Sequence, residues 1–291
     1  MESLFCQEVI SHVIDIEPVR SSVDIEPMVD QVLLTDKRVM DNMLAEESSH
    51  TVRDYCDNIQ TEVAPHMRKI VTDWMLEVCE DQHCQSEVFF LAVNYLDRFL
   101  SLVNIKKTQF QLVASVCILL ASKFSQVVPI SSEQLVIYTD NSVSLVELKE
   151  WELYVLSVLQ WELSTATAHS FLQHFCNNIH SNNNVRRQAE TIAALASTEY
   201  EFIQTKQSVI AAAALAAALK EELHSSEEVV NLLQNVATNM KTDLDEIYLV
   251  MYLIINLRSH VTHTSDKLSQ AEERPTTPDD VLNISQNEII V

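Results

Sequence analysis

The chain of 291 residues contains no glycine. Glycine is the residue that most easily adopts positive φ and that lets a phosphate group approach the backbone closely. Its absence removes the glycine-rich loops that hold dinucleotides and nucleotide phosphates. It also disfavours tight two-residue β-hairpins, whose turns depend on glycine. We therefore expect neither hairpin-rich sheets nor an ATP- or NAD-binding enzyme of the usual kinds.

The charge balance excludes a second group of functions. The chain carries 42 acidic and 19 basic residues, for a formal net charge of −23. Nucleic acids and anionic membranes repel such a polyanion unless it has a basic patch, and the basic clusters are as short as Arg68-Lys69 and Arg186-Arg187. The apolar run Val209–Leu219 is shorter than the ~20 residues that span a bilayer. We expect no direct contact with nucleic acid or membrane.

The six cysteines are scattered, and no signal peptide opens the chain. This pattern indicates reduced, mostly buried thiols in a soluble intracellular protein. Cys79, His83 and Cys84 cluster, but no second Cys or His pair follows at zinc-finger spacing. Neither Cys6 nor Cys176 has a paired base that would make it a nucleophile. We expect no metal, no cofactor and no catalytic residue.

Helical periodicity runs through most of the chain. Met67, Ile70, Val71, Trp74 and Val78 follow Pro65 at i, i+3, i+4, i+7 and i+11, and Pro65 suits a first helical turn. No segment alternates with period two long enough to make a strand. The fold class is therefore all-α, with helices expected at residues 36–47, from 65, and at 88–102, 110–124, 132–138, 146–161, 168–178, 185–204, 207–222, 227–238 and 243–257.

Two of these segments resemble each other. Residues 112–123 and 209–220 are apolar nearly all round and each ends at a lysine, as a central helix ringed by others should. Their offset of about a hundred residues predicts two tandem five-helix bundles. We divide the chain into a flexible arm at 1–30, bundles at 31–163 (with a short N-terminal helix) and 164–260, and a disordered tail at 261–291.

Several motifs resemble those of the cyclin family. Met67–Trp74 is similar to the opening helix of the cyclin box, and residues 94–100 and 120–124 are similar to its second and third helices. Residues 137–142 look like the D-type subgroup. The resemblance covers roughly residues 36–260 and implies two cyclin boxes. It also implies a non-catalytic subunit that activates a G1 cyclin-dependent Ser/Thr kinase and promotes the G1/S transition.

The resemblance assigns two residues to kinase binding. In cyclins a lysine that closes the third helix and a glutamate on the fifth contact the kinase, and Lys123 and Glu152 match these positions. The alternative is that Lys123 only interacts with a helix C-terminus, where cations are favoured, while Glu152 is solvated. In the context of the motifs we favour kinase binding.

The same resemblance implies a substrate-docking groove for Arg-x-Leu peptides. Its positions correspond to Met67, Ile70, Val71, Trp74, Glu77, Phe110 and Gln111. The alternative is a buried core stripe, but a second apolar set, Met75, Val78 and Cys79, is available to pack inward. Arg68 and Asp97 match an internal ion pair of the cyclin box, so we assign them to structure.

The segments before and after the two expected bundles each carry a motif. Leu4, Cys6 and Glu8 form a Leu-x-Cys-x-Glu peptide that resembles the docking motif of D-type cyclins for the retinoblastoma-type pocket protein. Thr277-Pro278 looks like the phosphorylation site that triggers D-type cyclin destruction, although Pro275-Thr276 departs from the expected pattern and leaves the modifying kinase open. The alternative is an unmodified acidic tail. The resemblance also implies kinase inhibitor proteins and ubiquitin-ligase machinery as partners, and shuttling between nucleus and cytoplasm.

Other classes remain as alternatives. Transcription initiation factors share the double five-helix fold, but they need a basic DNA-facing surface and usually a zinc ribbon. A helical enzyme lacks a set of acid, base and nucleophile. A transcription-associated cyclin or another cyclin-fold interaction module is the nearest alternative, and the Leu-x-Cys-x-Glu arm argues against it.

Overall fold

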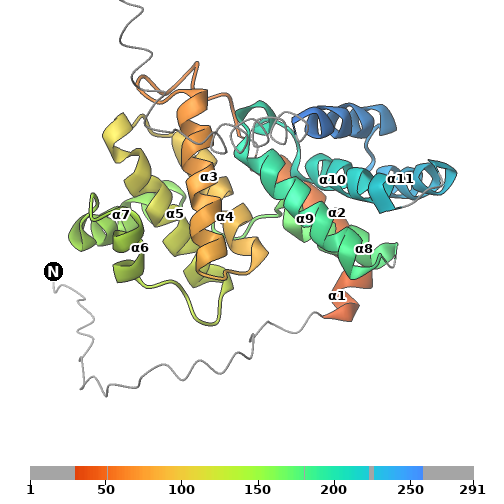
Figure 1. Ribbon diagram of the computed structural model, residues 1–291, viewed down its shortest axis with the longest axis horizontal. Helices are drawn as coiled ribbons and strands as arrows, with labels where there is room; N and C mark the ends of the chain where they lie inside the picture. The colour runs from red at the N-terminus through yellow and green to blue at the C-terminus, as the bar shows by residue number, and fades with distance from the viewer. Residues whose placement is uncertain (1–29, 51, 180, 223–225, 258–291) are drawn as a thin grey trace, which may run out of the picture.

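The computed structural model describes residues 30–50, 52–179, 181–222 and 226–257 (Figure 1). All regular secondary structure in these residues is helical. The helices form two groups that lie side by side, which confirms the expected all-α fold of two tandem bundles.

The first bundle surrounds α5 (Phe110–Ser125). Every residue from Leu112 to Ser122 is buried, because the segment is apolar nearly all round and neighbours pack on each side. Its surrounding helices are α3 (Pro65–Asp81), α4 (Ser86–Leu100), α6 (Ser132–Tyr138) and α7 (Leu145–Val158), and a short 3₁₀ turn at Lys107–Gln109 precedes it. By length and composition alone Lys107–Ser125 could span a membrane, and its place at the centre of the bundle accounts for that hydropathy.

The second bundle surrounds α10 (Gln207–Glu222) in the same way. Residues Ser208 to Leu219 are all buried, and eight of them are alanines or the small Ser208, which let neighbouring backbones approach closely. The neighbours are α8 (Ala168–Asn178), α9 (Asn183–Thr198), α11 (Ser226–Met240) and a helix at 244–257. The two buried helices are the two segments whose sequences resemble each other.

Two N-terminal helices, α1 (Gln31–Thr35) and α2 (Lys37–Ser49), precede the first bundle in sequence but pack on the second (Figure 1). The Glu47 carboxylate accepts hydrogen bonds from the Ser208 backbone N–H at 2.7 Å and from its Oγ at 2.9 Å. The first-turn N–H groups of a helix have no partner within the helix, so Glu47 supplies one to α10. Burial raises the pKa of Glu47, although the bonds from Ser208 oppose this.

Helix α9 is shorter than the sequence indicated. Apolar periodicity predicts a helix through residue 204, but α9 ends at Thr198, Glu199 is extended, and a 3₁₀ turn follows at Tyr200–Phe202. The reason is that side chains of α3 bind the last carbonyl groups of α9 and end the helix there.

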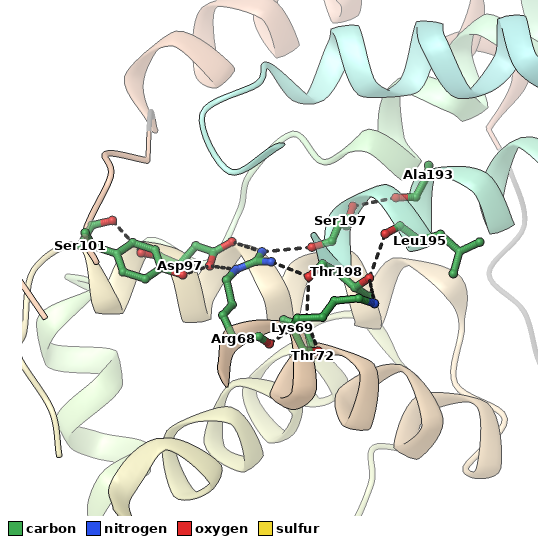
Figure 2. A network of polar contacts seen from close by, with 10 residues as sticks. Arg68, Lys69, Thr72, Asp97, Ser101, Ala193, Leu195, Ser197 and Thr198 are labelled. Carbon is green, nitrogen blue, oxygen red and sulfur yellow. Dashed lines mark hydrogen bonds and ion pairs between the residues drawn. The ribbon is translucent and has the colours of Figure 1, made fainter. Parts of the chain in front are cut away.

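Arg68 is the centre of this contact (Figure 2). Its guanidinium pairs with the Asp97 carboxylate (Nε–Oδ1 2.8 Å, Nη2–Oδ2 2.7 Å) and also donates to the carbonyl oxygens of Thr198 and Ser197 at 2.9 and 3.0 Å. Thr72 Oγ1 donates to the same Thr198 oxygen at 3.0 Å. The ion pair that the sequence assigned to the first bundle therefore also joins the two bundles.

The environment of this pair is dry. Arg68 is 1% exposed and Asp97 is 5% exposed, and the Tyr55 hydroxyl donates to Asp97 Oδ1 at 2.8 Å. Burial alone would lower the pKa of Arg68, but the Asp97 carboxylate outweighs it and holds that pKa above its ordinary value. Burial and the same carboxylate raise the pKa of Tyr55. The Arg68 guanidinium therefore stays charged in the folded protein.

The lack of glycine is visible where helices end. Within the described residues, six positions other than glycine have positive φ, and they follow α3, α6, α7 and α11: His83, Asp140, Asn141, Gln160, Trp161 and Lys241. A residue with a Cβ pays roughly 1–2 kcal/mol for this left-handed conformation. The backbone of these turns is therefore strained, and packing elsewhere in the fold offsets this energetic cost.

We predict that Gln160→Gly stabilises the protein. Gln160 is exposed and has φ 56°. Glycine relieves the strain of positive φ but raises the entropy of the unfolded chain, so we expect about 0.5–1 kcal/mol more stability than for the control Gln160→Ala, which keeps the Cβ. Urea unfolding of both variants measures this difference. A glycine variant less stable than the alanine variant would contradict the explanation.

We predict that Arg68→Met lowers the free energy of unfolding by about 3–5 kcal/mol, because it leaves the Asp97 carboxylate buried without its cation. The double variant Arg68→Met/Asp97→Leu removes that charge and should recover only part of the loss, since the α9 carbonyls still lack donors. Full recovery would show that the contact with α9 contributes nothing. Chemical denaturation monitored by circular dichroism provides the values.

Candidate functional site

Lys123 and Glu152 lie together on the first bundle. Lys123 is in the last turn of α5 and Glu152 is on α7, and the Lys123 Nζ is 2.6 Å from Glu152 Oε1. The Lys123 side chain is 46% exposed and that of Glu152 is 17% exposed. The two residues that the sequence assigned separately to kinase binding thus form one ion pair at the surface.

The position of Glu152 follows from how α7 begins and packs. Ser144 and Glu147 form a capping box: Ser144 Oγ accepts from the Glu147 N–H at 3.2 Å, and Glu147 Oε2 accepts from the Ser144 N–H at 3.0 Å. The bonds from Ser144 lower the pKa of Glu147. Leu148, Val155 and Leu156 are the buried residues of α7. With its start and inner face fixed, α7 presents Glu152 to Lys123 on α5.

Exposed apolar side chains adjoin this pair in sequence. Phe124 is 50% exposed, and Val127 and Val128, just past the end of α5, are 61% and 77% exposed. On α7, Leu153 is 63% exposed. Exposed apolar side chains on the segments that carry a polar pair are typical of protein–protein contact sites. None of these side chains was predicted from the sequence to contact a partner, and the available signal was the three apolar residues Phe124, Val127 and Val128 shortly after the helix-ending Lys123.

The predicted docking stripe lies on the outer face of α3. Ile70 is 65% exposed and Glu77 is exposed, whereas Met67, Val71 and Trp74 are half-buried. The second apolar set, Met75, Val78 and Cys79, is buried, as are Arg68 and Thr72. Inward and outward residues therefore alternate with the helical period, and the stripe remains accessible.

The two other residues of the stripe differ from each other. Phe110 is only 3% exposed, so its ring can lie beneath such a groove but offers almost no surface to a ligand. Gln111 is half-buried, and its Oε1 accepts from Ser142 Oγ at 3.2 Å. A peptide on this face would meet α3 first.

The remaining predicted positions lie elsewhere. Leu4, Cys6, Glu8 and Thr277 are outside the described residues. Within residues 30–257, apart from the short gaps, no group of three His, Cys, Asp or Glu side chains is arranged to hold a metal ion.

Comparison with known proteins matches both halves of this fold. The family described as "Cyclin, N-terminal domain" matches residues 38–164, and the one described as "Cyclin, C-terminal domain" matches residues 166–277. Together the two matches cover most of the chain.

Individual relatives are similar to this chain over most of its length. The chain is 39% identical to the G1/S-specific cyclin-D1 of Danio rerio over an alignment of 275 residues, and the alignment covers 88% of this chain and 94% of the relative. It is 36% identical to the G1/S-specific cyclin-D2 of Rattus norvegicus, and this alignment covers 98% of this chain and 99% of the relative. Among solved structures, a viral cyclin from herpesvirus saimiri aligns with a TM-score of 0.59 at 24% identity, covering 74% of this chain and 99% of the viral one, which shows the shared fold.

Proposed function

Because the chain belongs to the cyclin family, whose members are non-catalytic regulatory subunits of kinases, we propose that it binds and activates a G1 cyclin-dependent Ser/Thr kinase, directs it to retinoblastoma-type pocket proteins and so promotes the G1/S transition. The observation that carries the kinase proposal is the Lys123–Glu152 pair beside exposed apolar side chains.

The contact surface suits a partner that changes shape. Burial of Phe124, Val127 and Val128 against the kinase supplies apolar contact area. The paired charges of Lys123 and Glu152 set orientation, because both side chains are already held in place before the partner arrives. If the kinase offers matching groups only in its active arrangement, binding shifts its population toward that state without any chemistry from the cyclin.

The outer face of α3 is proposed as the docking groove for Arg-x-Leu peptides. Half-buried Met67, Val71 and Trp74 would receive the leucine, and exposed Glu77 would pair with the arginine. Support comes from the division of α3 into a buried inner face and an outer apolar face that stays partly accessible to a ligand.

The flanking segments are proposed to regulate and target the complex. Leu4, Cys6 and Glu8 would tether the pocket protein and raise its effective concentration at the kinase. Phosphorylation of Thr277 would mark the chain for ubiquitin ligases. Kinase inhibitor proteins would bind the assembled complex, which would shuttle between nucleus and cytoplasm.

We predict that the charge-swapped variant Lys123→Glu/Glu152→Lys loses kinase binding by at least about tenfold. The swap keeps an ion pair within the chain but reverses the charges that a partner meets. Lys241 and Asp41 form another exposed pair, at 3.5 Å, between the second bundle and α2, so Lys241→Asp/Asp41→Lys is the matched control and should bind normally. Binding of each variant to a purified G1 cyclin-dependent kinase is measured by isothermal titration calorimetry.

If the swapped variant binds and activates like wild type, the pair is only structural and the proposed contact surface is wrong. Circular dichroism melts distinguish a loss of kinase binding from misfolding, because the swap should leave the melting temperature nearly unchanged.

We predict that the triple variant Leu4→Ala/Cys6→Ala/Glu8→Ala raises KM for a retinoblastoma pocket fragment by about 10- to 100-fold, while phosphorylation of a short peptide substrate stays unchanged. The matched control, Ser3→Ala/Gln7→Ala/Val9→Ala, alters one intervening and two flanking positions and should leave both substrates unaffected. An equal loss on both substrates would place the motif in kinase activation instead of substrate tethering.

A further inference from the structure

The C-terminus of α3 brings two thiols together. The His83 N–H donates to the Glu80 carbonyl at 3.0 Å, the Cys84 N–H donates to the Cys79 carbonyl at 2.9 Å, and His83 has φ 51°. This is the Schellman arrangement, in which the residue after the left-handed position contacts the helix residue five positions earlier. That contact is usually apolar. In this chain it joins Cys79 and Cys84, and each thiol shifts the pKa of the other.

A pocket opens beside these thiols, between the two bundles. Its volume is about 290 Å³. On one side it is lined by the end of α3 and the start of α4, including both cysteines, Phe89 and Phe90; on the other side it is lined by α9, including Ala194 and Leu195. Three charged residues, Glu80, Arg187 and Glu190, also contribute to its wall. A small apolar molecule of fragment size fits a pocket of this kind.

The two thiols have different properties. Cys79 is buried, and its hydrogen bond to Cys84 together with burial raises its pKa well above the ordinary value. Cys84 is half-buried, and the hydrogen bond from Cys79 lowers its pKa, with a further contribution from Gln126, although burial opposes both. The pair thus loses its first proton from Cys84, the less buried of the two thiols that line the pocket.

We propose that Cys84 is a covalent modification site for soft carbon electrophiles, with the pocket between the bundles as their binding site and Cys79 as a positioning residue. The ligand class is an α,β-unsaturated carbonyl compound with a short apolar body. The Cys84 sulfur forms a bond to the β-carbon, the C=C π electrons move to the α-carbon, and that carbon takes a proton from solvent to replace the one that the thiol released. No oxidant or reductant is needed, and the inference does not depend on kinase binding.

The test compares alkylation rates within the full chain carrying Cys6→Ser, since Cys6 lies outside the described residues. N-benzylmaleimide serves as the apolar unsaturated carbonyl and iodoacetamide as a small probe, and peptide mass mapping follows each cysteine. Cys56 is the internal control, because it is also half-buried but burial raises its pKa. We expect N-benzylmaleimide to label Cys84 at least about tenfold faster than Cys56. Equal rates would overturn the proposal.

Three variants separate the roles of the thiol and the pocket. Cys79→Ala removes the hydrogen-bond donor and should slow Cys84 alkylation by both probes, whereas Cys79→Ser keeps a donor and should restore the rate. Ala194→Phe fills the pocket from α9 and should slow N-benzylmaleimide but not iodoacetamide. Fully buried Cys117 reports unfolding in every sample and should stay unlabelled. If Ala194→Phe slows neither probe, the pocket is not the binding site; if both Cys79 variants react alike, Cys79 has no positioning role.

Discussion

A single buried guanidinium determines how the two halves of this cyclin meet. Arg68 binds the Asp97 carboxylate within the first bundle and the last carbonyl groups of α9 in the second. Removal of both charges from water costs several kcal/mol. The pair therefore fixes the geometry of the contact between the bundles more than it adds to net stability. The N–H donors of its planar guanidinium group fit only one arrangement of these oxygen atoms. Lys69, the next residue, adds a half-buried counterpart by pairing with Glu199 at 3.2 Å.

The candidate binding surfaces depend on this arrangement. Because Arg68, Thr72, Met75 and Val78 commit the inner face of α3, the outer stripe from Met67 to Glu77 has a fixed orientation. The Lys123–Glu152 pair sits on α5 and α7, which are held by the same bundle. Sites on rigid helices lose little entropy when a partner binds, which suits a subunit that acts only by recognition.

The sequence predicted the features that depend on local pattern. The two central helices were visible because few positions in α5 and α10 are polar, and the outward stripe of α3 was visible because a second apolar set competes for the core. Lys123 and Glu152 were found only through family resemblance, since a separation of 29 positions carries no periodic signal. The contact from Arg68 to Ser197 and Thr198, 129 and 130 positions away, required the tertiary structure. The end of α9 was missed for the same reason, because the residues that end it belong to α3. His83 and Gln160 were missed as helix-ending turns because glycine, the usual marker, is absent.

The contact between Glu47 and Ser208 has a consequence for how the chain is made. The two residues are 161 positions apart, so at ribosomal elongation rates Ser208 follows Glu47 by on the order of ten to thirty seconds. Until the second bundle is synthesised α1 and α2 have no docking partner, although the first bundle is complete before then. The first helices to leave the ribosome are therefore among the last to find their native place. Cotranslational folding of this cyclin therefore ends when the N-terminal helix α2 docks on α10. Until α10 emerges, the unpartnered α2 is available to chaperones.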